Sequence, residues 1–329
     1  MKLARLLSPQ ARPFVPLFAV LLLGCALNAN GAFFEWQTQR AVLREIAVGG
    51  ILASGMTVVI VAGGIDLAVG SVLGLSAVIL AWLTLLHAVP GWLAVPLVLL
   101  VGALTGLVSG ALVAWPRLQP FIVTLGMMVF ARGLAKHVSG GEKISTYVHT
   151  PDGHFVSVPL PAVFERIDGR VFGGQVSVVT LIFLGCLLLT LVVLERLRIG
   201  RYLYAVGGNF EAARLSGVPV RGTLIFAYVL CGVLAAVAGV CQAAQETHGD
   251  PETGVGYELD AIAMVVLGGT SLSGGRGGVR LTLIGALTLG YLQKVLSLNA
   301  YSTELRLMLT GAILILAVLF QRRVGRESL

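Results

Sequence analysis

Long apolar runs constrain this chain more than any other feature of its sequence. A helix that spans the hydrocarbon core of a bilayer needs about 20 consecutive, mostly apolar residues. Such runs recur along the whole chain, at residues 13–30, 42–62, 68–88, 92–115, 121–136, 176–195, 222–244, 259–273, 279–296 and 304–321. We therefore expect an all-α polytopic membrane protein, with about ten transmembrane segments in a single transmembrane domain over residues 1–329.

The composition agrees with a chain surrounded by lipid. Of the 329 residues, 57% are hydrophobic and 12% are charged, whereas charged residues make up about 25% of an average soluble domain. The formal net charge is +7, but the basic residues gather in short segments between the apolar runs, and no nucleic-acid recognition motif accompanies them. We expect membrane lipid as a partner and no nucleic acid.

The distribution of Lys and Arg predicts the orientation, because these residues mark the cytoplasmic side of a membrane protein. They gather at the start of the chain, in the segment 195–221 and at the end, whereas the acidic segment 246–260 contains none. Ten crossings with both termini in the cytoplasm satisfy these signals. The polar segment 137–175 is then a periplasmic loop.

One apolar stretch predicts a broken helix. The sequence VIVAGGIDLAVGSVLGL at residues 59–75 contains small and acidic residues, namely Gly63, Gly64, Asp66, Gly70 and Ser71. A carboxylate at the centre of a bilayer costs on the order of 3 kcal/mol on insertion scales. We expect Asp66 either to cap the helix that follows or to form part of a proton or substrate site.

Two shorter apolar segments suggest further breaks. Residues 121–136 and 259–273 are short for a span, and short, glycine-interrupted segments can be half-helices around a transport path. We predict that the translocation path or its helix breaks include the residues above, residues of both segments and two glycines directly after the second: Thr124, Gly126, Gly268, Gly269, Thr270, Ser271, Gly274 and Gly275. An ordinary turn is the alternative for the prolines that precede Thr124.

A short exposed helix is predicted at residues 210–217, between two spanning segments. Asn209 can cap it, and Glu211 lies in its first turn, where the helix dipole favours an acid. Gly217 supplies a stop, and Pro219 prevents continuation. The residues alone allow either a structural turn or a helix on which a partner docks.

The string LSGGR at residues 272–276 resembles the signature of ATPases that power transport. An ATPase also needs a phosphate-binding loop that ends in Gly-Lys-Ser/Thr, and the sequence contains no such string. We therefore expect no ATPase site, no catalytic residue and no metal site in this chain, and we interpret these glycines as positions of close helix packing or helix breaks.

Together, three blocks resemble inner-membrane permeases of bacterial ABC sugar importers, in the ribose-type branch. The blocks are GGIDLAVGS, AVGGNFEAARLSGVPV and YELDAIAMVVLGGTSLSGGRGG, with QPFIVTLGMM as a weaker fourth, and the likeness extends from about residue 40 to 320. The family's ATPase-docking motif matches Glu211, Ala212, Ala213 and Gly217.

The resemblance implies a multi-pass protein of the bacterial inner membrane and several partners. A periplasmic sugar-binding protein would deliver a monosaccharide, and a second permease copy would complete the path as a homodimer or a paralogous heterodimer. A cytoplasmic ATP-binding subunit would hold ATP and Mg, so this chain would need no cofactor. Two departures concern the path: Ala68 stands where the family usually has Ser, and Gln119-Pro120 stands where it often has Pro-Pro.

Three alternatives remain at this point. The chain could be a branched-chain amino-acid permease of the same superfamily, or an ion-coupled secondary transporter that uses Asp66. It could also be a membrane enzyme that uses His149 and His154 of the 137–175 loop, although the sequence offers no further ligands beside them.

Overall fold

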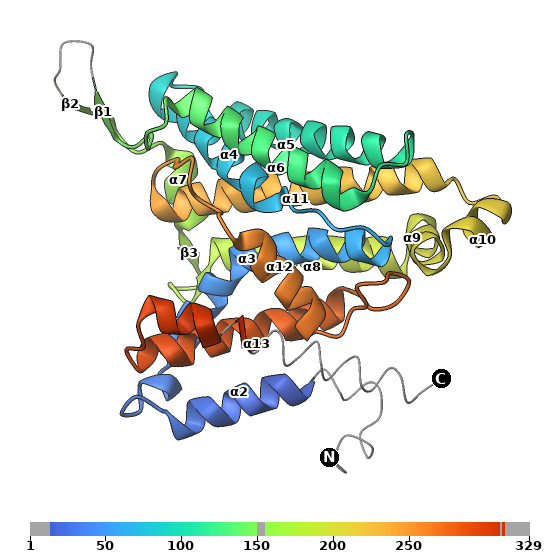
Figure 1. The fold of residues 1–329 in the computed structure, drawn as a ribbon. Helices are drawn as coiled ribbons and strands as arrows, with labels where there is room; N and C mark the ends of the chain where they lie inside the picture. The colour runs from blue at the N-terminus through green and yellow to red at the C-terminus, as the bar shows by residue number, and fades with distance from the viewer. Residues whose placement is uncertain (1–13, 150–154, 310, 313–329) are drawn as a thin grey trace.

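The computed structural model describes residues 14–149, 155–309 and 311–312, and helices dominate it (Figure 1). Within these ranges, seven helices are long and apolar enough to cross a membrane. They are α3 (Trp36–Val61), α4 (Val69–Ala81) with the π-helical turn η2 (Trp82–Leu86), α5 (Gly91–Ala114), α6 (Pro120–Ser139), α8 (Val178–Glu195), α11 (Val220–Glu246) and α13 (Val279–Leu298).

Three of the ten predicted segments are not among these seven spanning helices. The first is α2 (Phe14–Ala26), which has 13 residues, and α12 (Tyr257–Leu267) has only 11. Both are shorter than the roughly 20 residues of a full span. The predicted segment 304–321 lies mostly outside the described residues. The count of ten crossings therefore stays a prediction.

Small elements at the two ends of the bundle complete the fold. At one end lie the 3-10 turn η1 (Ala32–Phe34), α7 (Ala162–Asp168) and two antiparallel hairpins, β1 (Tyr147–His149) with β2 (Phe155–Ser157) and β3 (Arg170–Val171) with β4 (Val176–Ser177). At the other end lie α9 (Arg198–Gly208) and α10 (Phe210–Leu215) (Figure 1). Strands β1, β2 and β3 belong to the 137–175 loop, for which the apolar pattern predicted no strands, and β4 occupies the first two residues of the predicted segment 176–195.

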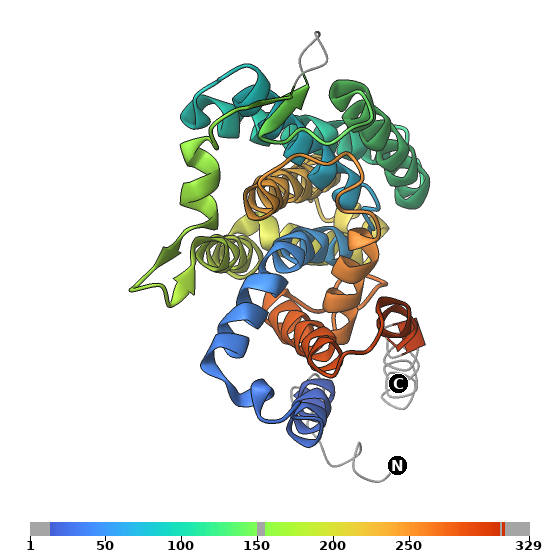
Figure 2. The same cartoon turned by 90° about the vertical axis from the view of Figure 1, so that its left-hand side faces the viewer.

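The helices differ strongly in how deeply they are buried. The most apolar 18-residue window of α3 is 83% buried, whereas that of α6 is 22% buried. Figure 2 shows α3 near the middle of the bundle, with α5 and α6 on one side and α13 and α2 on the other. The core thus centres on α3, and α6 is left open to lipid or to another chain.

Glycines allow α5 and α11 to pack backbone against backbone. A Cβ atom on Gly106 would lie 2.8 Å from the Tyr228 carbonyl carbon, and one on Gly232 would lie 3.1 Å from the Gly102 carbonyl carbon. Small residues are typical of helices that approach closely within a membrane. No larger side chain fits between these two helices.

Candidate functional site

The predicted break lies between α3 and α4. Helix α3 ends at Val61, and Gly63 adopts a left-handed backbone with φ of 86°, which glycine reaches without the steric cost that other residues meet. The Gly63 and Gly64 N–H groups donate to the Ile60 and Val59 carbonyls. The chain therefore leaves the helix without leaving these carbonyls unpaired, as an apolar environment requires.

Asp66 is buried in this break and organises the entry into α4. Its side chain is 4% exposed, and its Oδ1 accepts a hydrogen bond of 2.9 Å from the Ala68 N–H. The Cys231 thiol of α11 is a second hydrogen-bonding partner. Because α4 begins at Val69 and has no side-chain cap, the capping interpretation of Asp66 needs correction: its bond forms the preceding turn.

Thr124 joins the start of α6 to the same break. It is fully buried, and its Oγ1 lies 3.3 Å from the Ile65 carbonyl oxygen and 3.0 Å from that of Pro120. Two residues that the sequence singled out, Asp66 and Thr124, are thus brought to adjacent positions. Gly126 does not break α6, which is continuous there, and a Cβ at this position would meet open space.

Gly70 and Ser71 lie in the first turn of α4, against the segment that leads into α12. A Cβ on Gly70 would overlap the Gly254 carbonyl oxygen, and Ser71 is buried. Residues 247–256 run alongside α4 before the short helix α12 begins.

Arg132 of α6 holds this stretch by hydrogen bonds, and sequence reasoning missed it. Its Nη1 donates to the Pro251 carbonyl and, at 2.8 Å, to the Thr253 carbonyl. Lys136, one turn further along α6, forms an ion pair of 2.6 Å with Glu252. An arginine inside the apolar run 121–136 was the available signal, because intramembrane charges are costly unless they are paired.

The predicted glycine-rich segment after α12 folds back on itself. Thr270 is fully buried, and its Oγ1 accepts a hydrogen bond of 3.1 Å from the Gly278 N–H. The Ser271 N–H donates to the Arg276 carbonyl at 3.1 Å. Gly268 ends α12, and Gly269 has φ of 101°. These contacts close the loop that connects α12 to α13.

Glycines from three distant parts of the chain meet at what we call the glycine junction, formed by Gly63, Gly207, Gly274 and Gly275 with the Val61 carbonyl. The Gly275 N–H donates to Val61 O at 2.9 Å. A Cβ on Gly207 would overlap that oxygen and lie 2.8 Å from the Gly275 nitrogen, and one on Gly274 would lie 2.9 Å from Gly63 Cα. The end of α9 thus packs directly on the α3–α4 break.

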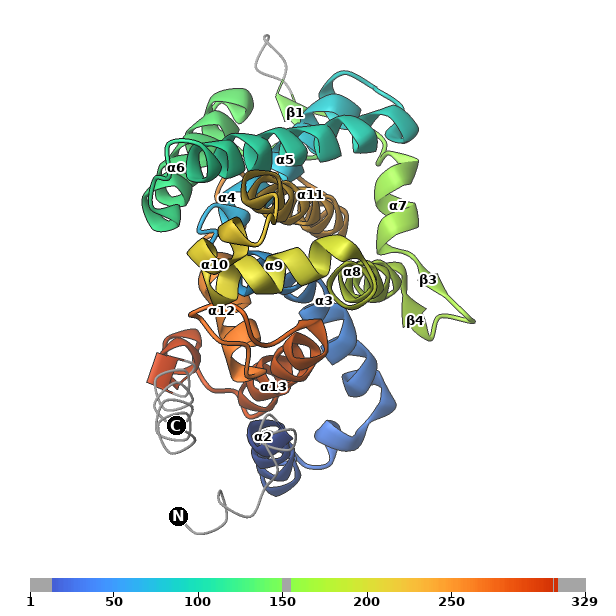
Figure 3. The ribbon, with the colours of Figure 1, turned by 90° about the vertical axis from the view of Figure 1, so that its right-hand side faces the viewer.

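The predicted short helix is present as α10, at the end of the bundle shown in Figure 3. The Asn209 side chain accepts a hydrogen bond of 3.0 Å from the Ala212 N–H, and Gly217 has φ of 80°. Glu211 is exposed, and its Oε2 lies 2.8 Å from Arg214 Nε. Both the cap and the stop are confirmed.

Only Asn209 separates α10 from α9, whose last two residues are Gly207 and Gly208. A displacement of α10 therefore reaches the glycine junction through one residue of chain. Gly207 was not among the predicted site residues. The pair Gly207-Gly208 at a helix end was the signal that could have found it.

Comparison with known proteins gives a consistent result. The family model described as branched-chain amino acid transport system / permease component matches residues 38–318. The chain is 37% identical to the ribose import permease protein RbsC of Escherichia coli (strain K12) over 322 residues, which covers 95% of this chain and 94% of the relative. It is 36% identical to RbsC of Bacillus subtilis (strain 168) over 317 residues, covering 94% and 92%. It is 37% identical to the fructose import permease protein FrcC of Rhizobium meliloti over 321 residues, covering 98% and 87%. No solved structure matches the chain.

Proposed function

Because the chain belongs to this family of permease components of bacterial ABC importers, we propose that it is the transmembrane permease subunit of an ATP-driven monosaccharide importer. The observation that carries the proposal is the identity of 36–37% with sugar import permeases over nearly the whole chain. These relatives favour a sugar over a branched-chain amino acid, although the family description names the latter.

The chain is a multi-pass protein of the bacterial inner membrane, as its relatives and its apolar helices indicate. For its orientation we propose that the end with α9 and α10 is cytoplasmic and the end with the hairpins is periplasmic, which agrees with the arginines of the 195–221 segment. Ten crossings with both termini in the cytoplasm, including segments that the structure does not describe, fit this orientation.

The proposed mechanism is mechanical and leaves every bond of the sugar intact. A separate ATP-binding subunit holds ATP and Mg and docks on α10 through the motif of Glu211, Ala212, Ala213 and Gly217. Its closure displaces α10, and Asn209 passes the displacement to α9. The support for this route is the close packing of Gly207 on Val61 and Gly275.

We propose that the displacement of α9 is transmitted to the α3–α4 break. Asp66 and Thr124 hold the ends of α4 and α6 there by hydrogen bonds to backbone groups, so that a shift of the break moves both helices. A partner that binds one of two conformations more tightly shifts the population toward that conformation. Access would then change from the periplasmic to the cytoplasmic side.

Two further partners complete the proposal. A periplasmic sugar-binding protein would deliver the monosaccharide at the end that carries the hairpins. A second permease copy, identical or paralogous, would complete the path. The face of α6 supports a membrane or protein neighbour, because Ile122, Val129 and Phe130 are each more than half exposed.

The docking role is tested by Glu211→Ala, which should abolish uptake of labelled monosaccharide into proteoliposomes that contain the binding protein and the ATPase. Copurification of the ATPase should fall in parallel, while membrane insertion stays normal. Glu142→Ala is the matched control, because Glu142 is an exposed carboxylate at the opposite end of the bundle. Normal uptake by a well-inserted Glu211→Ala chain would remove the docking role. Uptake of leucine but of no monosaccharide would instead favour the amino-acid permease.

A further inference from the structure

A basic cavity lies beside α10, and the proposed function does not use it. Its volume is about 350 Å³, and the turn between α5 and α6, the helix α10 and the first turn of α11 line it. Figure 3 shows these elements together at one end of the bundle. The volume falls at the lower end of the range of about 300–1,000 Å³ that is typical of small-molecule sites.

Three arginines line this cavity: Arg117, Arg214 and Arg221. Arg214 forms an ion pair of 2.7 Å with Glu211. In the part of the chain that the structure describes, Arg117 and Arg221 form no ion pair with an acidic side chain within 4.0 Å. The cavity therefore carries excess positive charge, and the planar guanidinium groups suit a phosphate, which they can bind through paired hydrogen bonds.

The backbone conformation and the contacts of Arg117 support a functional role for its charge. Its backbone is left-handed, with φ of 55°, a region that glycine enters freely and other residues enter at a cost of about 1 kcal/mol or more. Its guanidinium carbon lies 5.6 Å from the centre of the Phe210 ring, in a cation–π contact with α10. Strained backbone of this kind clusters at functional sites.

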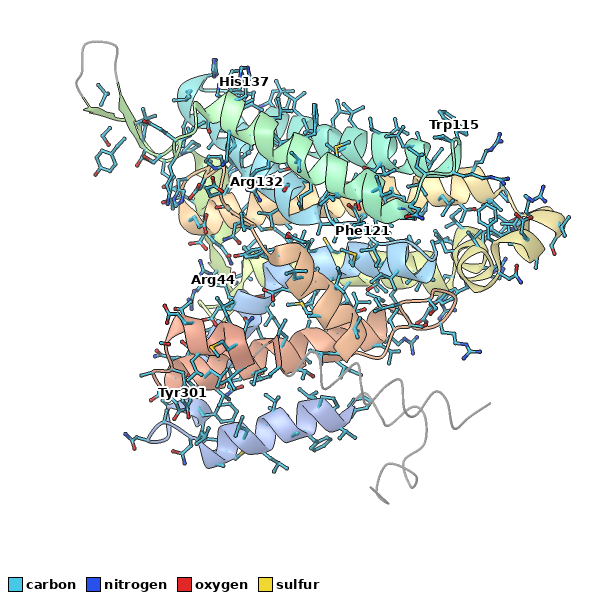
Figure 4. The ribbon with its side chains drawn as sticks, in the orientation of Figure 1. Arg44, Trp115, Phe121, Arg132, His137 and Tyr301 are labelled. Atoms are coloured by element: carbon cyan, nitrogen blue, oxygen red, sulfur yellow. The ribbon has the colours of Figure 1, made fainter. Side chains whose placement is uncertain are left out.

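Exposed apolar side chains near Arg117 favour a lipid headgroup as the source of the phosphate. Apolar side chains close in sequence to Arg117 are exposed, with Trp115 at 62%, Leu118 at 46% and Phe121 at 55%. Figure 4 shows Trp115 on the stretch that joins α5 to α6 and Phe121 in the first turn of α6. Tryptophan is enriched where the membrane meets water, so the cavity opens at the depth of lipid headgroups.

We propose that this cavity binds the phosphate-bearing headgroup of an anionic phospholipid of the inner leaflet, with Arg117, Arg214 and Arg221 as its ligands and the acyl chains against Trp115 and Phe121. Basic pockets between transmembrane helices on the cytoplasmic side hold such headgroups. The first turn of α11 adds backbone N–H groups and the positive end of a helix dipole. The cytoplasmic placement rests on the proposed function.

Such a lipid would connect α10 to the α5–α6 turn. The docking helix contacts Arg117 through Phe210 and contributes Arg214 to the cavity. A bound headgroup would bridge these groups and hold α10 in one position relative to the membrane surface. The activity of the assembled importer should therefore depend on anionic lipid.

The test is binding of short-chain phosphatidylglycerol to the purified full-length chain, measured by native mass spectrometry, with short-chain phosphatidylcholine and inorganic phosphate as separate probes. We expect phosphatidylglycerol to bind in preference to phosphatidylcholine. Arg117→Gln and Arg221→Gln should each weaken its binding about fivefold, the factor for one basic residue near an anionic membrane surface. The matched control, Arg201→Gln, changes an exposed arginine of α9 that does not line the cavity and should change nothing.

Several results would overturn the proposal. Equal binding of the two lipids, or an equal loss in Arg201→Gln, would show that the cavity does not recognise the headgroup. Phosphate that binds as tightly as the lipid would identify a site for free anions. Loss of bound phosphatidylglycerol when the ATPase assembles, together with weaker ATPase binding by Arg117→Gln, would assign the cavity to an acidic side chain of that partner. Because lipid binding is measured without transport, failure here leaves the proposed function standing.

Discussion

Replacing Gly207 with alanine tests whether α9 is joined to the α3–α4 break. The added Cβ would overlap the Val61 carbonyl oxygen and lie 2.8 Å from the Gly275 nitrogen. These two groups share a hydrogen bond of 2.9 Å, so backbone atoms on both sides must separate. Leaving a buried polar group unpaired costs about 1–3 kcal/mol, and overpacking a tight contact costs about 1–3 kcal/mol more. We therefore expect a loss of about 2–6 kcal/mol in the free energy of unfolding.

Two measurements separate a structural effect from a coupling effect. The midpoint of thermal unfolding in detergent should fall, and uptake into proteoliposomes should be lost even where the variant inserts and still copurifies with the ATPase. Gly208→Ala is the control, because a Cβ there meets nothing within 4 Å. Surface changes of that kind stay within about 0.5 kcal/mol. A Gly207→Ala chain with unchanged unfolding and unchanged uptake would refute the glycine junction as a mechanical link.

Three further predictions follow from single contacts. Asn209→Ala removes the cap of α10 and should cost about 1 kcal/mol of helix stability, seen as faster amide hydrogen exchange in α10; unchanged exchange would contradict it. Thr124→Val leaves the Ile65 carbonyl without its hydroxyl partner, so it should lower the unfolding midpoint more than Thr124→Ser, which keeps the hydroxyl. Burial alone would raise the pKa of Asp250, but a backbone N–H and the Lys143 ammonium outweigh it and lower that pKa. The stabilisation is therefore present above the usual pKa of about 4 and lost as pH falls through the lowered value. Asp250→Asn should remove this acid-side fall in the unfolding midpoint, and an unaltered pH profile would count against the contact.

The features that the sequence predicted depend on short stretches of chain. Each spanning helix follows from an apolar run of sufficient length, which needs no knowledge of its neighbours. Helix α10 could be predicted with its first residue correct and its end two residues too late, because Asn209 and Gly217 act on their own backbone. The α3–α4 break could be located for the same reason, since Gly63 and Asp66 lie beside each other in the chain.

The features that the sequence did not predict depend on contacts between distant segments. Nothing local to Gly207 shows that it faces Val61 and Gly275, and nothing local to Arg132 shows that its partners are the carbonyls of Pro251 and Thr253. The hairpins of the 137–175 loop are also too short to give an alternating pattern. These pairings arise only once the bundle has assembled.

The backbone contact between α5 and α11 limits how the molecule can change shape. With Gly106 against the Tyr228 carbonyl and Gly232 against that of Gly102, sliding of one helix along the other would cause a steric clash. We therefore expect the two helices to move as one rigid unit. Left-handed glycines lie between helices in the segments 62–68 and 268–278, and we expect bending there rather than within the pair. Stiffening either segment should then reduce transport while the contact between α5 and α11 stays intact.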